Sequence, residues 1–218
     1  MPIPLLLPDD PPDAFPDIED ALVEPNGLLA AGGDLSIDRL LYAYTHGIFP
    51  WYSDGEPILW WSPDPRCVLW PDNLKISRSL KKSARNSGIE IRVNTSFETV
   101  VNKCAAPRAA STGTWITDEM KYAYCAMNKA GYSHSVECWK GDRLVGGLYG
   151  VSIGKVFFGE SMFSAVRDAS KISLVHLVNE MDYELIDCQL PSEHLISLGA
   201  NIVGRRDFIE LLRGGLFN

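Results

Sequence analysis

The sequence has no apolar stretch long enough to cross a membrane, and its cysteines and histidines do not cluster. A transmembrane helix needs about 20 predominantly apolar residues, and every apolar run here is much shorter. The five cysteines contain no C-x-x-C pair, and the four histidines lack the spacing of metal ligands. The sequence therefore favours neither a membrane span, nor a disulfide framework, nor a metal site.

Common nucleotide-binding and hydrolase motifs are missing too. There is no G-x-G-x-x-G fingerprint and no G-x-S-x-G nucleophile turn. The segment 150–155 has only three residues between its glycines, too few for a phosphate loop. These absences argue against a dinucleotide site, a phosphate loop and an α/β-hydrolase centre.

The chain has fewer basic than acidic residues, with 20 Lys and Arg against 28 Asp and Glu, which gives a net charge of −8. A nucleic-acid partner would therefore need a local cluster of cations. Hydrophobic residues make up 46% of the 218 residues, enough for a packed core in one domain or a domain with a smaller module. The first residues are Pro-rich and acidic rather than basic, so we expect no secretory signal and a cytoplasmic protein.

The first 65 residues are rich in Pro and Gly and predict one clear helix. Ser36 is a suitable N-cap, and Ile37, Leu40 and Tyr44 follow at helical spacing. The stretch 48–66 contains tryptophans and prolines and predicts irregular structure packed by aromatic rings. Because residues before proline avoid the helical region, 62–65 predicts an extended linker. We therefore expect a small N-terminal domain over 1–64 and a larger one over 65–218.

The larger part alternates between the patterns of strands and helices. Predicted strands cover 66–70, 89–93, 135–139, 144–149, 156–163 and 185–189. Predicted helices cover 76–86, 168–181 and 207–212, and two others begin at Ser96 and Thr117. Strands joined by short loops should pair antiparallel, and the final strand–helix–strand should pair parallel. The predicted fold class is α/β (α+β) with a mixed sheet.

Four cations lie at helical spacing in the helix predicted over 76–86. They are Arg78, Lys81, Lys82 and Arg85. Residues three and four apart share one helix face, where four like charges repel each other. Ile76, Leu80 and Ala84 fall on the opposite side and are available for the core. The face is either an ordinary solvated surface or a binding site for a polyanion.

Two carboxylates interrupt apolar strands. Glu160 follows Phe157 and Phe158, and Asp187 lies between Ile186 and Cys188. Acids are rarely buried without partners, so each should face a cleft or a cation. Asp187 and Gln189 are two apart on a strand and should therefore point to the same side. A structural salt bridge is the alternative for either acid.

Two tryptophans lie in predicted loops. Trp51 follows Phe49-Pro50, and Trp115 precedes the helix that begins at Thr117. Loop tryptophans stack on nucleic-acid bases in many proteins. Most of the six tryptophans must belong to the core, so a structural role is the alternative for both.

Several longer motifs resemble the leucyl/phenylalanyl-tRNA–protein transferase family. They cover almost the whole chain and occur in the family's order. The motifs span 24–35, 47–51, 57–66, 113–117, 159–164, 186–189, 197–200 and 205–207. One departure is Ser192, which stands where relatives often carry Asn or Thr.

The resemblance implies an acetyltransferase-like (GNAT) C-terminal domain. It implies transfer of Leu or Phe, and possibly Met, from aminoacyl-tRNA to proteins that begin with Arg or Lys, which marks them for degradation by the N-end rule. The partners would be leucyl-tRNA, phenylalanyl-tRNA and these acceptor proteins. Neither a metal nor another cofactor such as acetyl-CoA is implied, and no membrane partner is expected.

The resemblance also implies roles for individual residues. Asp187 and Gln189 would lie at the reaction centre. We expect Asp187 to accept and orient, Gln189 to hold the amine or the developing oxyanion, and Glu160 to act chiefly in substrate binding. Trp51 and Trp115 would stack the 3′ adenosine, and the four-cation face would contact the tRNA backbone. The pocket for the amino acid side chain would be lined by Leu148, Phe157, Met162, Leu174, Leu177 and Ile186, for which plain core positions are the alternative.

Two other functions compete with this interpretation. An acyl-CoA-dependent N-acetyltransferase would carry a Gly-rich turn before a helix to hold the pyrophosphate. The corresponding segment here, 164–170, contains no glycine. A non-catalytic binder of charged tRNA would not require Asp187 or Gln189.

Overall fold

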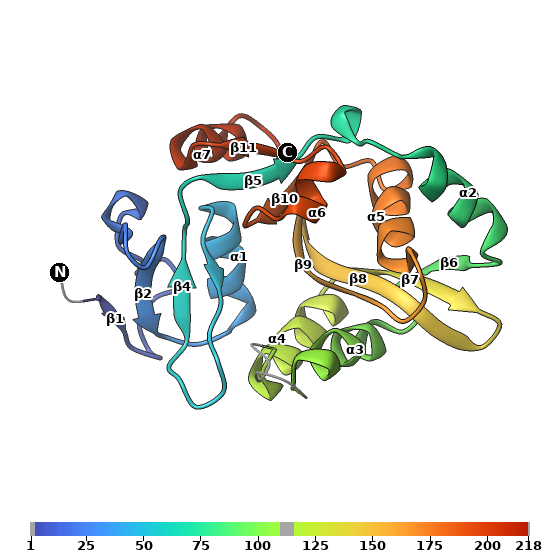
Figure 1. Cartoon of the computed structure of the whole chain (residues 1–218). Helices are drawn as coiled ribbons and strands as arrows, with labels where there is room; N and C mark the ends of the chain where they lie inside the picture. The colour runs from blue at the N-terminus through green and yellow to red at the C-terminus, as the bar shows by residue number, and fades with distance from the viewer. Residues whose placement is uncertain (1–2, 110–115, 218) are drawn as a thin grey trace.

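The computed structural model describes residues 3–109 and 116–217, and Figure 1 shows their arrangement. A four-stranded sheet forms near the N-terminus in the order β1 (Leu5–Leu6), β2 (Leu28–Gly32), β4 (Leu59–Trp61) and β3 (Phe49–Pro50). β1 and β2 pair parallel, and the other pairs are antiparallel. The prediction of irregular structure over 48–66 was therefore wrong for β3 and β4. These strands are too short to give an alternating pattern.

The predicted N-terminal helix is confirmed as α1 (Ile37–Thr45). The Ser36 side chain accepts a hydrogen bond from the backbone N–H of Arg39, as an N-cap should. A short 3-10 turn, η1 (Ile18–Asp20), precedes it in the chain. The buried face of α1 includes Leu40, Ala43 and Tyr44, and it joins the core of the larger sheet.

The larger sheet of the described residues has seven strands, and five of its six neighbouring pairs are antiparallel. Their order is β11 (Asn201–Val203), β5 (Arg66–Leu69), β10 (Leu185–Gln189), β9 (Val156–Ser164), β8 (Arg143–Ile153), β7 (Ser133–Lys140) and β6 (Glu90–Val93). Only β9 and β10 pair parallel in this sheet of described residues. The mixed α/β class predicted from the sequence is confirmed.

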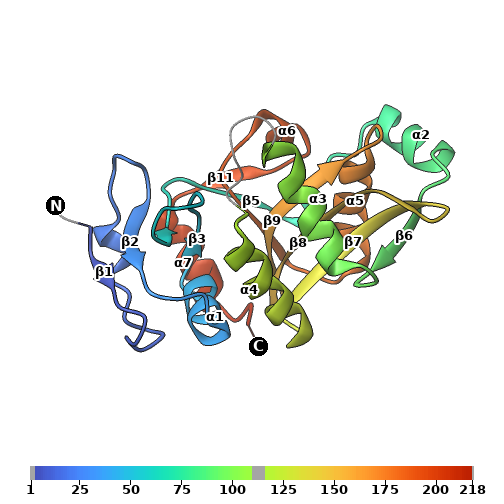
Figure 2. The same cartoon turned by 90° about the horizontal axis from the view of Figure 1, so that it is seen from below.

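Helices cover both faces of this sheet. α5 (Ala169–Glu180) packs on one face, and α3 (Phe97–Ala109) and α4 (Asp118–Lys129) pack on the other (Figures 1 and 2). The remaining elements of this part are η2 (Pro71–Asn73), α2 (Arg78–Asn86), α6 (Glu193–Ser197) and α7 (Arg205–Arg213). In the part of the chain described, no helix has the length and apolar character needed to span a bilayer.

The C-terminal helix α7 packs against the N-terminal part of the chain (Figure 1). Phe208 and Ile209 belong to the same hydrophobic cluster as Phe49. Gly47 has φ +72°, and a Cβ there would lie 2.5 Å from Cδ1 of Ile209. Glycine is favoured at this position both by the left-handed backbone and by the close approach of α7. This hydrophobic cluster contains residues from both sides of the predicted domain boundary between residues 64 and 65. The division of the chain into two domains at that boundary therefore stays a prediction.

The parallel pair β9–β10 separates at its carboxyl end. Pairing runs from Leu185 and Val156 to Asp187 and Phe158, whereas β9 continues with β8 as far as Ser164. On β9, Glu160 is an extra residue between the positions paired with Gly150 and Tyr149, which makes a bulge. On β10, a second irregularity lies between Asp187 and Gln189. The gap between the strands is where ligands bind in open α/β sheets.

Candidate active site

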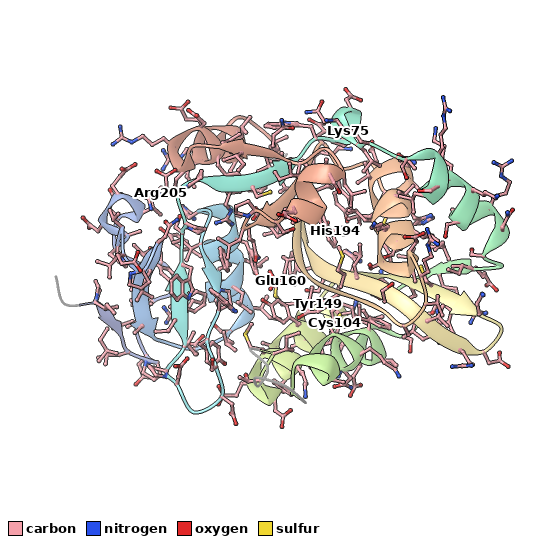
Figure 3. The ribbon with its side chains drawn as sticks, in the orientation of Figure 1. Lys75, Cys104, Tyr149, Glu160, His194 and Arg205 are labelled. Carbon is pink, nitrogen blue, oxygen red and sulfur yellow. The ribbon has the colours of Figure 1, made fainter. Side chains whose placement is uncertain are left out.

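A cavity of about 380 Å³ opens where β9 and β10 separate. It is bounded by the 49–51 segment, by β8, β9 and β10, and by α5 and α6. Glu160 on β9 and His194 on α6 are both on its lining, and both are labelled in Figure 3. The lining combines apolar side chains with the carboxylates of Glu160 and Asp187 and the amide of Gln189.

All six residues predicted to line an aminoacyl pocket are on the lining of this cavity. They are Leu148, Phe157, Met162, Leu174, Leu177 and Ile186. Met162 is partly buried and the other five are buried, and all six belong to or pack against the cluster on the α5 face. They are therefore core residues and cavity residues at once. Their role in substrate binding stays a prediction.

Glu160 is the hub of a buried hydrogen-bond network. Its Oε1 accepts from the Tyr44 hydroxyl at 2.7 Å and from Nε2 of Gln189 at 3.0 Å. Its Oε2 accepts from the Tyr124 hydroxyl at 2.7 Å. The two tyrosine hydroxyls are 2.6 Å from each other. The carboxylate thus joins α1, α4 and β10 at one point.

Burial changes the proton affinity of this carboxylate. It raises the pKa of Glu160 from 4.5 to about 7, and the nearby charge of Asp187 acts in the same direction. Hydrogen bonds donated by Tyr44, Tyr124 and Gln189 to the ionised carboxylate lower the pKa and oppose part of that rise. Glu160 therefore titrates close to neutral pH, where an acid–base group is most effective.

Asp187 faces a cation. The sequence predicted that each of the two acids in apolar strands would face either a cleft or a cation. Arg66 donates from Nε to Oδ1 at 2.9 Å and from Nη2 to Oδ2 at 2.6 Å. The guanidinium also donates to the Gly47 carbonyl, and it lies between the rings of Phe49 and Phe208 at 4.8 and 4.7 Å. Arg66 thus contacts both carboxylate oxygens, and this geometry fits the orienting role expected of Asp187. Its role as an acceptor stays a prediction.

Gln189 connects the two acids. Its backbone N–H donates to Oδ1 of Asp187 at 2.8 Å, and its side-chain amide donates to Glu160. Gln189 has φ +61°, which is uncommon for a residue with a side chain. The β10 irregularity and the Asp187 contact hold it there, so simple strand alternation does not describe how these side chains point. The amide remains on the cavity lining.

The structure describes only one of the two tryptophans that were predicted to stack on the adenosine. Trp51 lines the cavity, is 40% exposed, and lies 5.6 Å from the ring of Trp61. Trp61 donates from Nε1 to the Trp51 carbonyl at 2.6 Å, which fixes the segment. An exposed indole at a cavity edge is available for stacking. Trp115 lies outside the described residues.

The four-cation face forms on α2. Its helix is capped by Ser77, and all four cations are exposed. No ion pair joins them to a carboxylate of the described chain. Leu80 is buried and Ile76 packs partly against the α5 cluster, but Ala84 is exposed. The expectation for Ala84 was wrong because α2 packs on the rim of the domain, where only one turn reaches the core.

Residues that the sequence did not single out complete the site. Tyr44 and Tyr124 each fell on the apolar face of a predicted helix, where only their hydroxyl groups distinguish them from plain core residues. Arg66 lay beside a proline-rich linker and gave no signal. His194, at the start of α6, also lines the cavity, as does Ser192, which the sequence had already marked as a departure from the family pattern. Burial lowers the pKa of His194, and Lys171 lowers it further.

The family model for the leucyl/phenylalanyl-tRNA protein transferase matches residues 68–213, and the model for that family's N-terminal domain matches residues 33–64. The chain belongs to this family. A transferase of this name from Nitrosospira multiformis is 56% identical over 202 residues, which cover 91% of this chain and 87% of that one. Another from Azoarcus sp. BH72 is 58% identical over 198 residues, covering 89% and 84%.

Two solved structures are similar to this transferase family member at a much lower level. A conserved protein of unknown function from Bacteroides thetaiotaomicron has a TM-score of 0.44 and 14% identity, over 61% of this chain and 53% of that one. The C-terminal domain of a putative lysylphosphatidylglycerol synthetase from Agrobacterium fabrum has a TM-score of 0.38 and 12% identity, over 84% and 63%. Likenesses this remote say nothing about the site.

Proposed function

We propose that this chain transfers Leu or Phe from its tRNA to the N-terminal Arg or Lys of an acceptor protein, which marks that protein for degradation. The observation that carries the proposal is the cavity itself. It combines an apolar wall with the Glu160–Gln189 pair and the exposed indole of Trp51. An aminoacyl ester on a 3′ adenosine needs the same three features: a side-chain pocket, polar groups at the ester and a stacking surface.

The reaction needs little from the protein beyond alignment. The acceptor's α-amine attacks the ester carbon, a C–N bond forms, and the bond to the 3′ oxygen breaks. The amine loses one proton and the 3′ oxygen gains one. Because an α-amine has a pKa of about 7.7–8.0, a useful fraction is neutral at physiological pH. Placing amine and ester in contact therefore supplies much of the rate.

The polar residues divide these tasks. The Gln189 amide, tied to Glu160 through Nε2, is available to bind the amine or the developing oxyanion. Asp187 acts through the backbone of Gln189 rather than on substrate, because Arg66 occupies both of its oxygens. Asp187 is thus a positioning residue, and it does not bind the acceptor's cationic side chain.

The four-cation face of α2 would bind the tRNA backbone. Its cations are exposed and carry no described ion pair. Mutual repulsion on one helix face would be relieved by phosphates. This local cluster reconciles a net charge of −8 with a nucleic-acid partner.

An acyl-CoA-dependent acetyltransferase fits less well. Such an enzyme needs free backbone amides at the N-terminus of the helix that follows β9. Here the Ala169 N–H donates to the Val166 carbonyl, and the Ser170 N–H donates to the Ser164 hydroxyl. Asp168 is the N-cap of this helix, so a carboxylate near its N-terminus would also repel a pyrophosphate. These amides are already used within the loop.

The test is a transfer assay with radiolabelled leucyl-tRNA and peptides that begin with Arg, Lys, Asp or Ala. We expect label in the Arg and Lys peptides only, and a Gln189→Ala variant should bind the donor yet transfer it about 10²-fold more slowly. Donor binding without label in any peptide would support a non-catalytic tRNA binder. Acetylation of peptides by acetyl-CoA would support the acetyltransferase.

A further inference from the structure

The hydroxyl groups of Tyr44 and Tyr124 and the carboxyl group of Glu160 form a closed triangle of three contacts. The Tyr44 and Tyr124 hydroxyl oxygens are 2.6 Å apart, and each is 2.7 Å from a different oxygen of Glu160. All three separations are typical of O–H···O hydrogen bonds. Each contact therefore needs one hydrogen atom between its two oxygens.

The two hydroxyl groups supply too few hydrogens for the three contacts. A tyrosine hydroxyl has one hydrogen to donate, and an ionised carboxylate has none. If Glu160 were ionised and accepted from both tyrosines, the Tyr44–Tyr124 contact would bring two lone pairs together at 2.6 Å. A protonated carboxyl group adds one O–H donor, and the count then matches the number of contacts.

We propose that Tyr44, Tyr124 and Glu160 form a closed ring of three hydrogen bonds that holds one extra proton, so that Glu160 is a neutral acid in the resting protein. An ionised Glu160 would accept from Tyr124, and in the ring this bond is reversed. The carboxyl O–H on Oε2 donates to Tyr124, Tyr124 donates to Tyr44, and Tyr44 donates to Oε1. Oε1 stays a pure acceptor and also receives the Gln189 amide. A ring with a single direction strengthens each bond in it.

The surroundings of the ring favour the neutral form. The ring is buried among α1, α4, β8, β9 and β10. Among the described residues, the titratable groups that act on it are Tyr149 from β8 and Asp187 from β10, and Arg66 already compensates Asp187. Burial raises the pKa of Tyr44 and of Tyr124 well above 10, so both keep their hydrogens. Burial also raises the pKa of Glu160 to about 7.

A neutral Glu160 has a consequence for transfer, which rests on the proposed function. Attack on the ester places negative charge on the carbonyl oxygen, and an anion in contact with Gln189 would oppose it. Ionisation of Glu160 should therefore slow the chemical step as pH rises. Tyr44 and Tyr124 are positioning residues in this scheme, because they act on substrate only through Glu160 and Gln189.

Glu160→Gln is the first test because a glutamine amide, like a neutral acid, offers a donor and an acceptor. A carboxyl group whose pKa is raised on folding stabilises the fold below its unfolded pKa, and that contribution is lost as pH rises through the folded pKa. Relative to Glu160→Gln, the wild-type folding equilibrium should therefore weaken by roughly 10²-fold between pH 4.5 and 7. The infrared carbonyl band of a neutral acid should be present in wild type at pH 5.5 and missing in Glu160→Gln. A pH-independent difference and no such band would overturn the proposal.

Tyr44→Phe separates the ring from simple burial. With Glu160 neutral, removal of the Tyr44 hydroxyl breaks two hydrogen bonds of the ring. With Glu160 ionised, the same change breaks one hydrogen bond and removes the unfavourable contact between the lone pairs of the two tyrosines. The ring therefore predicts that the pKa of Glu160, followed by the infrared band, falls in Tyr44→Phe. If Tyr44 only donated to an ionised carboxylate, its removal would raise that pKa and exclude the ring. Tyr42→Phe on the same helix is the control and should leave the band unchanged. Neither measurement uses substrate, so each holds or fails independently of the transfer assay.

Discussion

Arg66 and Asp187 form a bidentate, buried ion pair, and their side chains are 1% and 0% exposed. They are 121 positions apart in the chain, and Arg66 also contacts Phe49 and Phe208. The pair therefore ties β5 and β10 to the loop after α1 and to the C-terminal helix. Through the Gln189 backbone N–H it also fixes the irregular end of β10 that borders the cavity.

Arg66→Met should destabilise the protein by about 3–5 kcal/mol, because it leaves the Asp187 charge buried without a partner. Adding Asp187→Asn should restore part of that loss by removing the charge. Denaturant unfolding of the two single variants and the double variant measures both effects. Strictly additive losses would show that the two side chains stabilise the fold independently.

Met162→Phe should discriminate between donors. Met162 lines the cavity and is only partly buried, so a larger side chain there fills the cavity with less strain on the core. We expect the transfer rate from phenylalanyl-tRNA to fall roughly 10-fold or more relative to leucyl-tRNA, since a methylene-sized clash costs about 1–3 kcal/mol. Competition between the two labelled donors provides the ratio, with Met162→Leu as the control of similar volume. An unchanged ratio would remove Met162 from the donor pocket.

Lys81→Ala combined with Lys82→Ala should weaken tRNA binding and reduce its dependence on salt. Loss of two phosphate contacts lowers the slope of log K against log salt by about 1–2. Binding measured over a salt series tests this, and peptide affinity should stay the same. Lys103→Ala with Lys129→Ala, both exposed on the helices of the opposite sheet face, is the matched control. Equal slopes for all three proteins would mean that the α2 face is only solvated.

Trp51→Ala should weaken binding of a minimal aminoacyl-adenosine donor by about 1–3 kcal/mol, the typical contribution of base stacking. Trp51→Phe should recover part of the affinity because it keeps an aromatic face. Since the Trp51 indole is 40% exposed, thermal stability should change little. A loss of stability as large as the loss of affinity would indicate a packing role beside Trp61 instead.

The sequence by itself determined the features that depend on near neighbours. Helical spacing after the Ser36 cap located α1, and the apolar and basic faces over 76–86 located α2, because capping and face formation are decided within a few residues. Strands joined by short loops predicted the antiparallel pairs, and the final strand–helix–strand unit predicted the parallel pair of the larger sheet. The six apolar cavity residues came from the family resemblance and not from periodicity, since an apolar strand residue looks the same in a core and in a pocket.

Only the tertiary structure decided which polar groups meet. Glu160 and Asp187 were visible as acids in apolar strands, yet their different partners depend on contacts across 29 to 121 positions of the chain. Arg66 satisfies one acid, whereas two tyrosines and an amide surround the other. The β-bulge at Glu160 and the left-handed Gln189 also escape prediction, because alternation assumes a regular strand. Three-dimensional contacts decide whether a buried carboxylate is paired with a cation or takes up a proton. The charge of the carboxylate follows from those contacts.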